Sequence, residues 1–210
     1  FIPAARNSYA ALYAACEQEG FTLEPVGAPA PDVTCYSLNS LTASRYLNEI
    51  RDAPCVTIVG GPHATACPAE MAKIADYVIV GEGEYLLPAL LRSLKKGGPV
   101  PGGVATANGF VPADHCVRLD GYPPFSTMKG YIEISRGCPH ACAYCQTPRI
   151  FGPYMRHRSI DAITRAARRF RDARFVTPNA LAYGSDGRTP RLEKVKHLLS
   201  ALHHKDQHIY

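Results

Sequence analysis

The sequence predicts an α/β protein built on a parallel sheet, and three observations support this fold class. Short runs with strand character alternate with segments of helical periodicity over residues 1–96. The runs are almost continuously apolar, as is typical of strands buried on both faces of a sheet. Two of them stop at glycine, one at Gly60-Gly61 and the other at Gly81. Together these features favour a Rossmann-like, doubly wound sheet in the first half of the chain.

The elements of the first half are expected in a regular order. Asn7 can cap the first helix and Gly20 can end it. A doubly wound sheet usually begins with a strand, so the sequence indicates that a first strand is missing, as in a fragment. The predicted helices span residues 8–19, 41–51, 68–75 and 84–95, and the predicted strands span residues 32–38, 55–59 and 77–80, with a short edge strand at 24–26.

The second half has a different composition. Residues 97–128 are rich in glycine and proline, which favours a linker or a set of short strands over a helix. Beyond them the alternation of strand and helix resumes, so we expect a first domain over 1–96, a linker over 97–128 and a second domain over 129–210. The predicted strands of this domain span residues 131–135, 175–177 and 208–210, and the predicted helices span residues 159–171, with Ser159 as its cap, and 191–203.

The composition argues against a membrane-spanning, a secreted or a disulfide-rich protein. The chain has 210 residues, 46% of them hydrophobic, and no apolar run long enough to span a bilayer. Phe1 opens the chain without the pattern of a secretory signal. Eight cysteines are too few for a disulfide scaffold, so we expect reduced thiols in the cytoplasm. Residues 1–130 carry a net charge of −3 and residues 131–210 a net charge of +8, which suggests two domains with different partners.

Three of the thiols are clustered directly after the predicted strand 131–135. Cys138, Cys142 and Cys145 have C-x3-C-x2-C spacing. Soft thiolates in a compact loop suit an iron–sulfur cluster or zinc. A zinc site with His140 as fourth ligand is an alternative, although structural zinc sites usually pair two C-x2-C knuckles. Free structural cysteines or a disulfide are further alternatives, and a disulfide would leave one thiol over.

This loop, with the aromatic Tyr144 before its last cysteine, resembles the radical S-adenosylmethionine (SAM) superfamily. The resemblance implies that the second domain is the first part of a (β/α) barrel. It implies that Cys138, Cys142 and Cys145 hold a [4Fe–4S] cluster, which an electron donor such as ferredoxin or flavodoxin reduces. The cluster then cleaves SAM to a 5′-deoxyadenosyl radical. By the same resemblance Tyr144 and Asn179 contact SAM. Asn179 lies where the family usually has a Gly-Gly-Glu-like segment, and it also suits a simple turn after Pro178.

The two strand ends of the first domain that contain glycine, at Gly60-Gly61 and at Gly81, support a second resemblance. Ligands of open α/β sheets bind at such carboxyl ends. Followed by a cysteine loop, these ends resemble the cobalamin-binding domain that precedes many radical SAM domains, and the match looks closest to uncharacterised archaeal-type members. The chain lacks a D-x-H-x-x-G motif, so no histidine is marked as a cobalt ligand. His63 also suits a turn, and Glu82 also suits a helix N-terminus. The cobalamin contacts that the resemblance implies are Ser37, Asn39, Gly60, Gly61, Pro62, His63, Gly81 and Glu82.

A basic stretch follows the cysteine loop. Residues 156–174 contain seven arginines. They suit either an RNA-binding face or the solvated side of the first barrel helix, and no aromatic residues interleave for base stacking.

Three functions remain open on the sequence. The first is a cobalamin-dependent radical methylase that acts on an unactivated carbon. The second is a radical SAM enzyme whose sheet domain is only a scaffold, with cyclisation, rearrangement or RNA sulfur insertion as its reaction. The third is a non-enzymatic metal- or RNA-binding module. The sequence marks no catalytic acid or base and no substrate, and a barrel of only two βα units and the start of a third predicts that the fragment alone is inactive.

Overall fold

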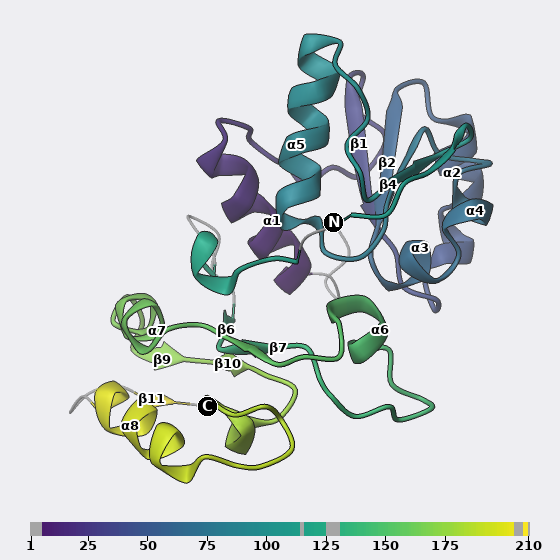
Figure 1. Cartoon of the computed structure of the whole chain (residues 1–210). Helices are drawn as coiled ribbons and strands as arrows, with labels where there is room; N and C mark the ends of the chain where they lie inside the picture. Colours follow the sequence, from purple (N-terminus) through teal and green to yellow (C-terminus); the bar gives the residue numbers. More distant parts are fainter. Residues whose placement is uncertain (1–5, 114–115, 125–130, 204–207, 210) are drawn as a thin grey trace. The chain divides into compact units, whose positions relative to one another are not determined.

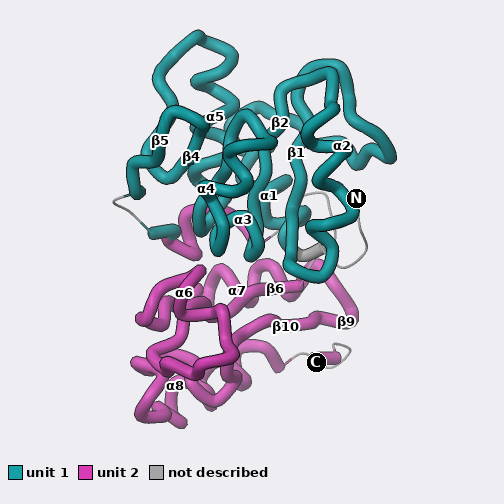
Figure 2. The backbone as a smooth tube through the Cα atoms, turned by 90° about the vertical axis from the view of Figure 1, so that its right-hand side faces the viewer, with its two compact units in different colours: residues 1–117 teal, residues 118–210 magenta. Residues whose placement is uncertain are grey.

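The computed structural model describes residues 6–113, 116–124, 131–203 and 208–209. The chain forms two compact units, unit 1 over residues 1–117 and unit 2 over residues 118–210 (Figure 2). The boundary between Val117 and Arg118 lies inside the segment predicted as a linker, because residues 104–110 add two strands to the sheet of unit 1. The domain bounds at 96 and 129 stay a prediction.

Unit 1 is built on a five-stranded sheet with the order β1-β2-β3-β4-β5. The first three strands are parallel, as predicted, and the last two add to the sheet in antiparallel fashion. Ser37 at the end of β1 pairs with Gly60 at the end of β2, so the carboxyl ends of these strands meet at one edge. The strands are β1 Val33–Ser37, β2 Val56–Gly60, β3 Tyr77–Ile79, β4 Val104–Thr106 and β5 Gly109–Phe110.

Helices cover both faces of this sheet. Helices α1 and α5 lie on one face and α2, α3 and α4 on the other (Figure 1). Helix α5 ends at Gly97, which adopts the left-handed conformation of a C-terminal cap. The helices are α1 Arg6–Gln18, α2 Leu47–Asp52, α3 Pro62–Ala66, α4 Pro68–Met71 and α5 Gly83–Lys96, with a short 3-10 turn η2 at Ala43–Arg45.

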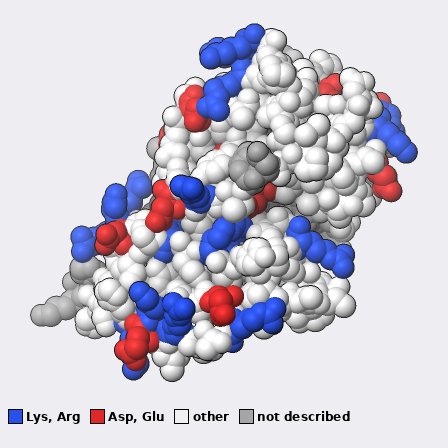
Figure 3. Space-filling view, in the orientation of Figure 1, with Lys and Arg blue, Asp and Glu red and all other residues white. Residues whose placement is uncertain are grey.

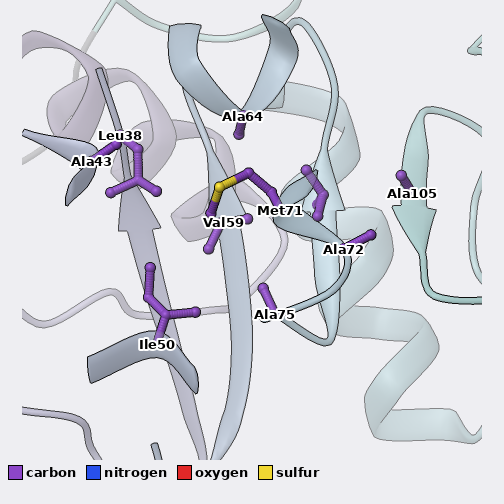
Figure 4. Close-up of a cluster of buried hydrophobic side chains, with 10 residues drawn as sticks. Leu38, Ala43, Ile50, Val59, Ala64, Met71, Ala72, Ala75 and Ala105 are labelled. Carbon is purple, nitrogen blue, oxygen red and sulfur yellow. The ribbon is translucent and has the colours of Figure 1, made fainter. Parts of the chain in front are cut away.

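The core explains why the strands are apolar throughout. Successive residues of a strand point to opposite faces, and both faces are packed. Val59 is fully buried against α3 and α4 with Met71 (Figure 4), whereas its neighbour Ile58 packs with Leu87 and Leu90 of α5 on the other face.

Unit 2 contains two βα units and a further strand, as predicted. Strand β6 pairs in parallel with β10, and β11 pairs in parallel with β9, the extended segment just before β10. Ser159 caps α7 by accepting a hydrogen bond from Ala162 N at 3.3 Å. The parallel elements are β6 Ile132–Glu133, α7 Ile160–Ala167, β9 Asp172–Ala173, β10 Phe175–Val176, α8 Leu192–Leu202 and β11 His208–Ile209.

Two predicted elements are wrong. Residues 24–26 form no strand, because a run of three residues with a central proline has too few backbone donors to pair. The predicted helix 41–51 is split into η2 and α2, since the Asn39 side chain accepts hydrogen bonds from the backbone N–H groups of Leu41 and Thr42 and starts a turn there. None of the helices in the described ranges has the length and hydropathy that a bilayer-spanning helix needs.

Candidate functional site

The three clustered cysteines lie on a hairpin. Strand β7 (Ser135–Arg136) pairs in antiparallel fashion with β8 (Arg156–His157), and Cys138, Cys142 and Cys145 fall in the loop between them. We call residues 135–157 the cysteine hairpin. Its far limb contains the five-residue helix α6, Thr147–Phe151. The sequence predicts the first residue of β7 as the end of the strand 131–135 but gives no apolar pattern for β8, so it does not predict the hairpin.

The root of the cysteine hairpin is closed by backbone contacts. Gly137 has φ +84°, and a Cβ at this position would lie 2.1 Å from the carbonyl oxygen of Tyr154. Cys138 N donates to the carbonyl oxygen of Gly152 at 3.3 Å, and Arg156 Nη2 donates to that of Phe151 at 2.6 Å. The two limbs therefore approach one another so closely that only glycine fits at position 137.

A buried guanidinium ties the hairpin to the first barrel strand. Arg136 is 4% exposed and donates from Nε and Nη2 to the two carboxylate oxygens of Glu133, at 2.8 and 2.6 Å. Its Nη2 also donates to the hydroxyl of Tyr122 at 2.7 Å, and its guanidinium lies over the ring of Phe151. A bidentate ion pair of this kind fixes direction as well as distance.

A second buried arginine supports the same region. Arg158 is 1% exposed; its Nε donates to the carbonyl oxygen of Glu133 and its Nη1 to that of Tyr122. Burial lowers the pKa of Arg158, and the nearby Tyr122, Glu133 and Asp120 oppose that effect. Within the described residues its Nη2 has no hydrogen-bond partner. Arg158 is thus internal and Arg156 half-buried, and both precede the helix α7.

The thiols themselves are accessible. Cys142 is exposed, and Cys138 and Cys145 are half-buried. Cys145 N donates to the carbonyl oxygen of Cys142 at 3.0 Å, which turns the chain between them. Hydrogen bonds from the side chain and then the backbone of Thr147 lower the pKa of the Cys145 thiol. Among the described residues no three metal-ligating side chains converge on one point.

The donor set of the hairpin fits an iron–sulfur cluster. Three thiols on one short loop are the soft ligands that such a cluster takes. The predicted alternative zinc ligand, His140, is placed differently, since its Nε2 lies 3.1 Å from the carbonyl oxygen of Gly187. Cys138, Cys142 and Cys145 are therefore the residues that would hold a cluster.

The residues predicted to contact SAM occupy different environments. Tyr144 is 93% exposed, next to Cys145. Asn179 caps the 3-10 turn η4 (Ala180–Ala182), where its Oδ1 accepts from Leu181 N at 3.1 Å. The structure therefore gives Asn179 a turn role, and its contact with SAM stays a prediction.

The residues predicted to contact cobalamin meet at one edge of the unit 1 sheet. Gly61 has φ +91°, and a Cβ there would lie 2.7 Å from the carbonyl oxygen of Leu38 and 3.3 Å from Ser37 Oγ. His63 N donates to the same carbonyl oxygen at 3.1 Å, in the first turn of α3 that Pro62 begins. Gly60, Gly61 and His63 thus lie beside the end of β1.

Other predicted cobalamin residues have structural partners. Asn39 Oδ1 accepts from Leu41 N, Thr42 N and Thr42 Oγ1. Glu82 Oε2 accepts from Val117 N at 2.9 Å. Gly81 has φ +86° and its N–H donates to Thr65 Oγ1 at 2.9 Å, which joins the end of β3 to α3. Ser37, Gly60 and Gly61 are half-buried at this edge.

The remaining arginines of the basic stretch are exposed on and after α7. They share this surface with Asp161 and Asp172, and on the face shown in Figure 3 the basic side chains of the helices of unit 2 lie beside acidic ones. This mixture favours a solvated helix surface over a continuous polyanion-binding face. These arginines are Arg165, Arg168, Arg169, Arg171 and Arg174.

Comparison with known proteins agrees with this geometry. The Radical SAM superfamily profile matches residues 132–209. Hopanoid C-3 methylase of Methylococcus capsulatus is 30% identical over 169 residues, which cover 68% of the chain and 33% of that protein. Bacteriochlorophyllide d C-12(1)-methyltransferase of Chlorobaculum tepidum is 26% identical over 137 residues, 62% of the chain and 30% of that protein. The chain spans about a third of the length of each of these relatives.

A solved structure shares the fold of both units. TsrM of Kitasatospora setae, a radical SAM methyltransferase solved with tryptophan and a SAM analogue, matches with a TM-score of 0.64 and 17% identity. The match covers 95% of the chain and 48% of that chain. A second TsrM structure, with cobalamin and a [4Fe–4S] cluster bound, matches with a TM-score of 0.63. At this identity the likeness establishes the fold alone. The matched profile therefore places residues 132–209, which include the cysteine hairpin, in the radical SAM superfamily.

Proposed function

We propose that the protein is a cobalamin-dependent radical SAM methyltransferase that methylates an unactivated carbon. The observation that carries the proposal is the cysteine hairpin, which presents Cys138, Cys142 and Cys145 at the start of a βα barrel segment. Support for methyl transfer comes from relatives named as methylases and from the fold shared with TsrM.

In this proposal Cys138, Cys142 and Cys145 hold a [4Fe–4S] cluster. When bound, the cluster supplies the electron that cleaves SAM, with a ferredoxin- or flavodoxin-type protein as the electron donor. The chain's own residues position this group. The ion pair of Arg136 with Glu133 fixes the direction in which the chain leaves β7. The close approach of Gly137 to Tyr154 fixes the position at which the cysteine loop begins. Tyr144 and Asn179 are the proposed SAM contacts, beside and beyond the loop.

Cobalamin is assigned to the carboxyl edge of the unit 1 sheet. The turns at Gly60-Gly61 and Gly81 carry no side chains, so a large planar ligand can approach the backbone of this edge closely. Ser37 offers a hydroxyl to the same edge. Asn39 and Glu82 contribute by holding η2 and the end of unit 1 in place.

A substitution at Gly61 tests the cobalamin assignment. Gly61→Trp is expected to weaken retention of cobalamin through gel filtration by about tenfold or more, because its side chain would displace Leu38 and Ser37 at the edge where the ligand is proposed to bind, and a loss of about 1.4 kcal/mol of binding free energy is a factor of ten. Gly20→Trp is the matched control, since Gly20 also has a positive φ but a Cβ there meets nothing within 4 Å.

Two further outcomes keep the test decisive. A folded Gly61→Trp protein that retains cobalamin like the wild type would show that the site is misplaced. If Gly61→Trp unfolds, Gly60→Val replaces it, because a Cβ at Gly60 makes only ordinary contact with Ile79, at 3.7 Å. A wild-type protein that binds iron but no cobalamin would favour a radical SAM enzyme with unit 1 as scaffold.

A further inference from the structure

A loop after the second barrel strand reaches back to the cysteine hairpin. We call residues 183–189 the bracing loop. Its conformation is fixed from within: Asp186 Oδ1 accepts from the backbone N–H groups of Arg188 and Thr189, both at 2.9 Å, and Gly187 N donates to Ser185 Oγ at 3.0 Å. Such side-chain to backbone bonds define a turn without help from a ligand.

The bracing loop is anchored to β8. The hydroxyl of Tyr183 donates to the carbonyl oxygen of Arg158 at 2.7 Å. Gly184 N donates to His157 Nδ1 at 3.2 Å, so His157 carries its proton on Nε2, which donates to the carbonyl oxygen of Ser185 at 2.7 Å. His157 Nδ1 also accepts from Ser135 Oγ at 2.8 Å. The base of the bracing loop is therefore joined to both strands of the hairpin root.

The tip of the bracing loop contacts the segment between the first two cysteines. Arg188 Nη2 donates to the carbonyl oxygen of Pro139 at 3.0 Å, and His140 Nε2 lies 3.1 Å from the carbonyl oxygen of Gly187. Gly187 has φ +86°, and a Cβ there would lie 2.6 Å from Pro139 Cδ and 2.6 Å from Met155 Sδ. Two polar contacts and one close backbone approach thus converge on Pro139 and His140.

We propose that the bracing loop positions the first half of the cysteine loop, with Arg188 as its positioning residue. Arg188 holds Pro139, the carbonyl group of Gly187 holds His140, and these contacts restrict where Cys138 and Cys142 lie before a metal binds. The restraint on Cys145 is weaker, because the bracing loop contacts the chain before Cys142, whereas Cys145 is also held by Thr147 of helix α6. The role of the thiols as cluster ligands rests on the proposed function, whereas the restraint on the loop does not.

The test is the reactivity of the thiols in the metal-free protein. In Arg188→Ala, alkylation of Cys138 and Cys142 by a maleimide is expected to rise about fivefold relative to Cys145, the factor that corresponds to one lost hydrogen bond. Peptide mapping by mass spectrometry reads each thiol separately. Arg188→Lys keeps a donor for the Pro139 carbonyl and is expected to restore most of the protection. Arg165→Ala removes an exposed arginine of α7 and should leave all three rates unchanged.

A second measurement separates this proposal from the proposed function. After anaerobic reconstitution, Arg188→Ala should lose iron to a chelator about fivefold faster than wild type, with Arg188→Lys close to wild type. Unchanged alkylation in Arg188→Ala, or a rise shared equally by Cys145, would overturn the positioning role even if the wild type holds a cluster. Conversely, a wild type that takes up no iron would refute the cluster while the alkylation pattern still tests the restraint.

Discussion

Replacing Cys138, Cys142 and Cys145 together by Ala is expected to abolish cluster binding. The anaerobically reconstituted wild type should be brown and hold about four iron atoms, the content of a [4Fe–4S] cluster. Each ligand contributes one Fe–S bond, and within the described ranges no group of three metal-ligating side chains elsewhere could replace them. Iron analysis and the visible absorption of the purified variants measure the loss.

The matched control is a thiol away from the hairpin. Cys116 is exposed and lies in unit 1, so Cys116→Ala tests whether iron adheres to any accessible thiol. It should keep the wild-type iron content. Iron that persists in the triple Ala variant, at the level of Cys116→Ala, would exclude the cysteine hairpin as the cluster site.

Gly137→Ala is expected to destabilise unit 2 by about 2–6 kcal/mol, because backbone strain at a positive φ costs about 1–3 kcal/mol and overpacking adds about 1–3 kcal/mol. The added methyl carbon would lie 2.1 Å from the carbonyl oxygen of Tyr154, so the root of the hairpin has to open. Denaturant unfolding, with a probe in unit 2, measures the change in the free energy of unfolding.

Gly152→Ala separates backbone strain from overpacking, because it is expected to produce the strain alone. Gly152 has the same φ, +84°, in the same hairpin, but a Cβ there meets nothing within 4 Å. Its cost should therefore be limited to strain, about 1–3 kcal/mol. Equal destabilisation by the two substitutions would mean that the close approach of Gly137 to Tyr154 does not contribute to the free energy of unfolding of unit 2.

Strong local signals explain what the sequence predicts well. The strands of unit 1 are β-branched runs that must be apolar because Ile58 and Val59 are buried on opposite faces of the sheet. Helix α5 combines an apolar stripe with a glycine cap at Gly97. The spacing of Cys138, Cys142 and Cys145 identifies a candidate metal site directly, since three soft ligands within eight residues have few other uses.

What the sequence does not predict depends on contacts between distant segments. The two residues of β8 have no apolar pattern of their own and are strand only because β7 pairs with them. Arg158 belongs to a run of charged residues, yet it is buried by Tyr122 and Glu133. The bracing loop shows only an Asp-Gly turn signal, and nothing local indicates that Arg188 reaches Pro139.

The pairing of β7 with β8 makes the length of the cysteine loop independent of the register of the barrel strands. Because the limbs close on one another at Gly137 and Gly152, the path of the loop between them does not set the register of the parallel strands β6 and β10. The segment that carries the three thiols is an insertion in the connection between β6 and α7. Its length and composition can change, or be exchanged between proteins, without shifting the strands that carry it, provided that the closing residues are kept.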